Sequence, residues 1–158
     1  MSRYAVLVGQ IERELGSLQQ LVSQTDSLMQ KVQVTGDTDY LGTIALNLHG
    51  FYSGAERIFR DIATDLDGSL PDRSDWHRRL LRQMASNVPN IRPTILNGPT
   101  LKALNEHCAF RHVVRNIYSF DLIPEKVEAL AISLPKAYTL LSTDLEEFTQ
   151  FLIDIDGA

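Results

Sequence analysis

Residues 4–32, YAVLVGQIERELGSLQQLVSQTDSLMQKV, contain the pattern that decides the fold of this chain. Apolar side chains, with one threonine among them, recur at alternating steps of three and four residues, which places them on one face of an α-helix. The positions are Tyr4, Leu7, Ile11, Leu15, Leu18, Val22, Thr25, Met29 and Val32. The stretch therefore predicts a long amphipathic helix whose apolar face is buried against other elements.

The next stretches of the chain continue this pattern. Thr35-Gly36-Asp37 breaks the first helix. A second amphipathic helix covers residues 41–62, with an apolar position at every third or fourth residue, and it ends near the Asp-Gly-Ser-Leu-Pro turn at 67–71. Ser74 is a good N-cap and predicts a shorter helix, which is interrupted at residues 87–93.

The last third of the chain predicts two more long helices. Asn97-Gly98-Pro99 gives a turn with proline near the first helical position, and the helix that follows runs to about Tyr118 or Phe120. Pro124 repeats this start signal, and Pro135 within the last helix predicts a kink or a break. Because no stretch resembles a strand or a repeat, we expect an all-α fold, an antiparallel bundle of four main helices plus one short helix.

Length and composition bound the class of protein. At 158 residues the chain fits a single domain, residues 1–158, whose core needs neither disulfides nor metal. Its lone cysteine, Cys108, excludes an internal disulfide framework and leaves too few thiols for a zinc site. We expect no metal and no cofactor, because the histidines are scattered and there is no Gly-rich phosphate loop. No membrane span or signal segment is visible, so we expect a cytoplasmic protein.

The charged residues are unevenly spread. The net charge of −5 gives no general attraction to nucleic acid, so any RNA contact must be local. One basic cluster covers residues 73–82, and we interpret it as a solvated helix face. A second cluster consists of Arg111, His112 and Arg115.

The second cluster lies on the helix predicted after Asn97. Placing residues about 100° apart predicts a core side made of Ala103, Phe110, Val113, Val114, Ile117 and Phe120. The remaining face collects Leu101, Leu104, His107, Cys108, Arg111, His112, Arg115, Asn116 and Tyr118. On that face the two leucines are compatible with a subunit interface. Arg111, Arg115 and Tyr118 are nearly eclipsed, and the two arginines repel unless an anion, an acidic partner or solvent compensates.

Two interpretations of this face remain open. In the functional one it is a phosphate site, with two guanidiniums for the phosphate oxygens and a phenol and an imidazole as donors or proton carriers. In the structural one it is a solvated helix face with a salt bridge to an acidic residue such as Glu56 or Asp61. His49, near the apolar side of the second helix, is expected to be a core histidine.

The segment Phe110-Arg111-His112-Val113-Val114-Arg115-Asn116-Ile117-Tyr118 resembles the signature helix of HepT-like proteins of the HEPN superfamily. That family carries an arginine, a histidine four to six positions later and often a tyrosine two residues after the histidine. Arg111 and Tyr118 match the arginine and the tyrosine. Asn116 stands at the histidine position, and His112 stands where many members have asparagine. Residues 46–62 and the Asp75-Trp76-His77 helix start are similar to one HepT-like subgroup.

This resemblance implies a homodimeric, metal-independent endoribonuclease that is the toxin of a toxin–antitoxin pair. The implied partners are RNA as substrate and a small MNT-type nucleotidyltransferase as antitoxin, which in some pairs transfers AMP to the motif tyrosine, here Tyr118. The candidate catalytic residues are Arg111, His112, Asn116 and Tyr118, and the candidate substrate contacts are Arg115 and His107.

The roles of these residues follow from phosphoryl chemistry. A base takes the proton of the ribose 2′-hydroxyl, that oxygen attacks the adjacent phosphate, and Arg111 and Arg115 stabilise the negative charge. His112 or His107 must carry the proton, because asparagine does not titrate near neutral pH; His112 is the better candidate because Arg111 adjoins it. The departure at Asn116 supports an alternative function, a catalytically silent HEPN module that binds RNA, a nucleotide or the nucleotidyltransferase.

Overall fold

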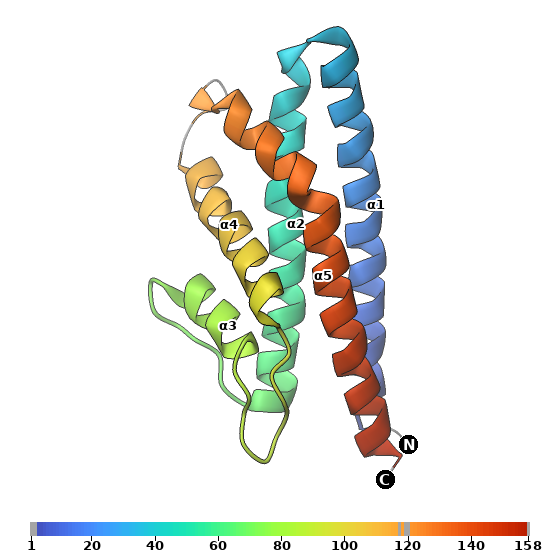
Figure 1. The fold of residues 1–158 in the computed structure, drawn as a ribbon. Helices are drawn as coiled ribbons and strands as arrows, with labels where there is room; N and C mark the ends of the chain where they lie inside the picture. Colours follow the sequence, from blue (N-terminus) through green and yellow to red (C-terminus); the bar gives the residue numbers. More distant parts are fainter. Residues whose placement is uncertain (1–2, 117, 119–120, 158) are drawn as a thin grey trace.

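The chain folds into an antiparallel bundle of long helices with a shorter helix at one side (Figure 1). The computed structural model describes residues 3–116, 118 and 121–157. The helices are α1 (Ala5–Thr35), α2 (Leu41–Ile62), α3 (Trp76–Met84), α4 (Gly98–Arg115) and α5 (Pro124–Asp156). Within the described ranges no β-strand is present, so the predicted all-α architecture of four main helices and one short helix is confirmed.

The central element is α2, which contacts each of the other four helices. Its inner face carries Phe51, Tyr52 and Phe59, whose side chains are fully buried. Burial of each such ring stabilises the fold by roughly 1.5–3 kcal/mol. Gly54 lets α1 approach α2 closely, since a Cβ at this position would lie 2.5 Å from Cδ2 of Leu18.

The glycine turns end their helices as the sequence predicts. Gly36 has a φ of 69° and forms the left-handed cap of α1. After α2 the chain widens into a π-helical turn at Ala63–Asp67, and Gly68, with a φ of 70°, ends that turn. The positive φ favours glycine at both positions, because a side chain there would be strained against its own backbone.

Two predicted features of the helices differ in detail. Asp75, not Ser74, precedes the first residue of α3, and its carboxylate accepts a hydrogen bond from Nε of Arg79 at 2.8 Å. Pro135 does not break α5, which continues through it, although the N-terminal part of the helix leans away from the rest in Figure 1. Of the two predicted outcomes, a kink or a break, the break does not occur, and α5 remains one helix through the proline.

The connection between α3 and α4 is fastened to the end of α2 and to α5. Arg92 is 4% exposed, and its Nε and Nη2 donate to the two carboxylate oxygens of Asp67 at 2.7 and 2.8 Å. Nη2 also donates to the carbonyl of Gln83 at 3.1 Å. At the start of α4, the backbone N–H and the side-chain amide of Asn97 both donate to Asp144 of α5 at 2.9 Å. These contacts set the position of α3 and α4 relative to α2.

The buried face of α4 is not the predicted one. The buried residues are Thr100, Leu104, His107 and Cys108. Val113 is 48% exposed, and Ala103, Phe110 and Val114 are only partly buried; Ile117 and Phe120 lie outside the described residues. The burial stripe is thus rotated by about a third of a turn, because α4 packs against α2 with a partly polar face and leaves part of its apolar face open. Leu104 is therefore in the core and unavailable for a subunit interface.

Candidate functional site

A pocket of about 300 Å³ lies between the start of α3 and the second half of α4. Because α3 runs down the side of the bundle while α4 runs up it, the first turn of α3 lies beside the later turns of α4 (Figure 1). The pocket is lined by Ser74, Asp75, His77, Arg78, Cys108, Arg111, His112, Arg115 and Asn116. Four of the six predicted site residues therefore meet at one pocket, and its wall from α3 adds residues that the motif does not contain.

A buried hydrogen-bonded chain joins α2, α3 and α4 at this pocket. Glu56 of α2 is 5% exposed, and its Oε2 lies 2.6 Å from Nδ1 of His77 on α3. On the other side of the ring, Nε2 of His77 lies 3.3 Å from Nη1 of Arg111 on α4. An arginine can only donate and a carboxylate only accepts. The imidazole therefore carries its proton on Nδ1, facing Glu56, and accepts from Arg111 at Nε2.

The ring of His77 is also held from the side. Trp76 lies against it, with ring centroids 3.6 Å apart and an interplanar angle of 30°. The guanidinium of Arg60 lies over the ring of Trp76, 5.2 Å from its centroid. The side chain of His77 keeps 22% of its surface exposed, so the ring is both oriented and accessible.

Arg111 has hydrogen-bonding capacity to spare. A guanidinium has five N–H donors, and the structure gives Arg111 one hydrogen bond, at the long distance of 3.3 Å to His77. Its Nε is buried with no acceptor among the described residues, and no ion pair of the described chain involves it. The predicted alternative of a direct salt bridge to Glu56 is therefore wrong, because His77 lies between the two. Unused donors at the wall of a pocket favour an anionic ligand.

His49 of α2 lies close enough to the two arginines of α4 for their charges to affect its pKa. His49 is partly buried, and its pKa is lowered first by that burial and then by Arg111 and Arg115, while Glu56 opposes the shift. A lowered histidine pKa next to two arginines means that added positive charge is disfavoured there. His49, expected to be a core histidine, instead borders the arginine cluster.

His107 does not belong to the pocket. Its side chain is 1% exposed and packs on Phe51, with ring centroids 5.1 Å apart. Burial lowers the pKa of His107 to about 4, so the ring is neutral at neutral pH. The expectation that His107 contacts the substrate or carries its proton is wrong, because the rotation of α4 turns this residue into the core.

The end of α4 separates Tyr118 from the arginines, whereas Asn116 remains at the pocket wall. The side-chain amide of Asn116 donates to the carbonyl of His112 at 2.7 Å, and Asn116 caps the helix. Tyr118 lies beyond this cap and is 72% exposed. The predicted alignment of Tyr118 with Arg111 and Arg115 required a helix to residue 118 and is wrong, since α4 ends at Arg115.

The sequence contained a signal for the part of the site that the motif misses. Glu56 lies among the buried residues of α2, next to Ala55 and one turn before Phe59. A carboxylate on such a stripe needs a buried partner, and the structure supplies His77, which the sequence placed in a solvated basic cluster. No local pattern identifies that partner, because α3 is a separate element.

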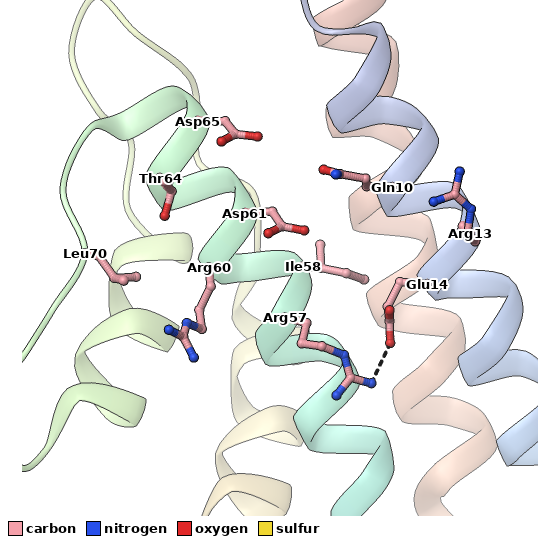
Figure 2. Close-up of a pocket in the computed structure, with 10 residues that line it drawn as sticks. All are labelled: Gln10, Arg13, Glu14, Arg57, Ile58, Arg60, Asp61, Thr64, Asp65 and Leu70. Atoms are coloured by element: carbon pink, nitrogen blue, oxygen red, sulfur yellow. Dashed lines mark hydrogen bonds and ion pairs between the residues drawn. The ribbon is translucent and has the colours of Figure 1, made fainter.

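A second polar hollow lies between α1 and α2 and differs in character (Figure 2). Its charges are mixed, and Arg57 pairs with Glu14 across it at 2.8 Å. The pKa of Asp61, which the sequence offered as a partner of the arginine cluster, is raised by burial and by Asp65 and Glu14. Asp61 thus faces other acidic groups here and belongs to a different side of α2 from Arg111. Three arginines and three carboxylates line this hollow, whereas three arginines and one carboxylate line the α3–α4 pocket.

Comparison with known protein families identifies the chain. A family model described as HepT-like protein matches residues 43–152, which include Glu56, His77 and the whole α4 pocket. The chain is a HepT-like protein. Neither the curated proteins nor the solved structures contained a match. Membership of this family points to a HEPN-type toxin module that acts with an antitoxin partner. In the described part of this HepT-like protein, every helix is too short or too polar to cross a membrane.

Proposed function

We propose that this HepT-like protein is a metal-independent endoribonuclease toxin of the cytoplasm, neutralised by a nucleotidyltransferase antitoxin. The observation that carries the proposal is Arg111: an oriented guanidinium with unused donors, at the wall of a pocket that also holds Arg115 and His112. Such a pocket accepts a phosphodiester, whose oxygens take charge-assisted hydrogen bonds from arginine.

The reaction requires no group that this pocket lacks. The ribose 2′-hydroxyl loses its proton to a base, its oxygen bonds to phosphorus, and the bond from phosphorus to the 5′-oxygen breaks. Arg111 and Arg115 neutralise the charge that grows on the phosphate in the transition state. His112, which lines the same pocket, is the histidine of the motif helix that exchanges a proton with the reacting groups.

The proposal also includes AMP transfer to Tyr118 by the antitoxin and a homodimer of this chain. Tyr118 is 72% exposed, so its side chain lies at the surface, where a nucleotidyltransferase that transfers AMP can approach it. An adenylyl group at the end of α4 would add negative charge next to an anion site and oppose RNA binding. For the homodimer, the support is the open apolar face of α4 and the start of α5, where Val113 is 48% and Ile123 49% exposed.

One observation favours the second candidate function, a catalytically silent module. Asn116 occupies the histidine position of the family motif, and its amide is bonded to its own helix at the carbonyl of His112. If no other group moved the proton, the pocket would bind RNA without cleaving it.

Cleavage of a fluorescent RNA oligonucleotide by purified protein, in the presence of EDTA, tests the proposal. We expect wild type to cleave and Arg111→Ala to lose about 100-fold or more in rate. Arg82→Ala is the matched control, because Arg82 lies on α3 outside this pocket, and it should cleave normally. Intact mass of each sample verifies that Tyr118 is unmodified. Tight RNA binding without cleavage by unmodified wild type would establish the silent module instead.

A further inference from the structure

We propose that His77, oriented by the buried carboxylate of Glu56, is the general base of this site. This rests on the proposed ribonuclease function and adds to it a catalytic pair that lies outside the motif helix. It also explains how the site can act with asparagine at position 116, since the proton-accepting imidazole comes from α3.

The geometry of the pair is that of an activated base. The carboxylate of Glu56, 2.6 Å from Nδ1, holds the ring proton on that nitrogen. The lone pair of Nε2 is therefore directed away from Glu56, toward Arg111 and the pocket. When Nε2 takes a proton, the imidazolium that forms is stabilised by the buried carboxylate, as in the carboxylate–histidine pairs of hydrolases.

Arg111 links substrate binding to the release of this base. Its Nη1 donates to Nε2 at 3.3 Å, which is longer than a well-formed N–H···N or N–H···O bond. A phosphate oxygen carries negative charge and is a stronger acceptor than an imidazole nitrogen. A phosphodiester that enters the pocket therefore accepts the hydrogen bond from Nη1 in place of His77. The lone pair of Nε2 is then free to face the 2′-hydroxyl.

The other histidines do not meet these requirements. His107 is sealed in the core, and His49 does not line the pocket. His112 lines it, but within the described part of the chain no side chain orients its ring. His112 instead suits the opposite role. The attacking and leaving oxygens lie on opposite sides of phosphorus, and α3 and α4 form different walls of the pocket.

The proton balance assigns one step to each residue. The 2′-O–H bond breaks and the proton goes to Nε2 of His77, while the 2′-oxygen bonds to phosphorus. The bond to the 5′-oxygen breaks, and that oxygen takes a proton from protonated His112. The products are a 2′,3′-cyclic phosphate and a free 5′-hydroxyl, and exchange with water restores both histidines. The charged groups around His77 are Glu56 from α2, Arg111 from α4, and Asp75 and Arg78 beside it on α3. Arg60 of α2 lies over the adjacent ring of Trp76.

The test compares two substrates that differ in the leaving group. An RNA dinucleotide needs an acid for its 5′-oxygen, whereas uridine 3′-(4-nitrophenyl phosphate) releases a phenolate that needs none. We expect His77→Ala to lose about 100-fold or more in kcat on both substrates, the range of general-base catalysis. Glu56→Gln should lose activity on both as well, and His112→Ala only on the dinucleotide. Arg82→Ala is again the matched control.

A pH profile and a binding measurement separate catalysis from folding. With the nitrophenyl substrate, wild-type kcat/KM should rise with pH through one imidazole ionisation, and His77→Ala should lack this rise. Binding of an uncleavable 2′-O-methyl oligonucleotide should change less than about threefold in His77→Ala. If wild type cleaves and His77→Ala keeps both its rate and its rise with pH, this inference is overturned and the ribonuclease function stands. If unmodified wild type cleaves neither substrate, the proposed function itself fails.

Discussion

At the scale of single residues, burial decides what each histidine does. His77 and His107 are both on helices that pack against α2, yet one ring is 22% exposed with a partner on each nitrogen, while the other is in the core. Neither ring nitrogen of His107 has a hydrogen-bond partner in the described chain, and the hydroxyl of Thr100, two turns earlier on α4, is in the same state. These buried polar groups without partners lower the stability of the fold, and the pattern of apolar residues in α4 does not indicate this.

The first prediction concerns the pH dependence that His107 imposes on folding. Its pKa is lowered from 6.5 to about 4 in the folded chain, so the unfolded chain binds the proton more readily. Stability is then complete above pH 6.5 and falls by up to about 3 kcal/mol as the pH approaches 4. Urea unfolding at pH 7.5 and 4.5 measures this loss. His107→Leu should reduce it, and the exposed-site control His112→Leu should not.

An equal loss of stability in wild type and His107→Leu would contradict this assignment. The acid sensitivity would then come from groups other than His107.

At the scale of elements, the site depends on how α3 is held. The first turn of α3 provides His77, and its C-terminal end is fixed by Arg92, which binds both Asp67 and the carbonyl of Gln83. The side chains of this pair are 0% and 3% exposed, whereas those of the Arg79–Asp75 pair are 45% and 51% exposed. The two arginine–aspartate ion pairs thus differ in burial, one being buried and the other exposed to solvent.

The second prediction compares these pairs. Arg92→Met should lower the free energy of unfolding by about 3–5 kcal/mol, because it leaves the carboxylate of Asp67 buried without its cation. Arg79→Met should lower it far less than Arg92→Met, because solvent screens the exposed pair. Chemical denaturation of both variants checks the contrast. The double variant Asp67→Leu/Arg92→Met should recover much of the loss, and a loss as large as that of Arg92→Met would refute this account.

At the scale of the whole molecule, the net negative charge of the chain repels RNA, the proposed substrate. The chain carries a net charge of −5, so attraction to RNA must come from the few basic groups at the α3–α4 pocket. Arg78, Arg111 and Arg115 are the arginines that line it. The mixed charges of the α1–α2 hollow in Figure 2 contribute no comparable site.

The third prediction is a shallow dependence of RNA affinity on salt. With three phosphate contacts, a plot of log K against log salt for a single-stranded 2′-O-methyl oligonucleotide should have a slope of about −2. Arg115→Ala should reduce the slope to about −1.4, since one contact is lost. Arg13→Ala, in the α1–α2 hollow, is the control and should keep the wild-type slope. Fluorescence anisotropy at several salt concentrations measures it, and a slope steeper than about −4 would show that RNA binds over a wider surface.

Four of the predicted site residues lie together at one pocket, but the predicted buried face of α4 was wrong. Arg111, His112, Arg115 and Asn116 do line one pocket, because residues three or four apart on a helix are close in any fold. His107 and Leu104 were assigned to the open face and are buried. Hydrophobicity alone misplaced them, since α4 presents partly polar residues to α2 and leaves Val113 in solvent.

The sequence by itself determined the helices and the ends that glycine or proline marks, because helical periodicity and these signals act over a few residues. It also determined that Arg111 stands beside other basic groups on one helix. Only the tertiary structure decided that Arg111 meets His77, 34 residues away, and that His77 meets Glu56, 21 residues away. Those contacts depend on how α2, α3 and α4 pack against one another, and that packing is a balance of buried surfaces and paired charges over the whole bundle.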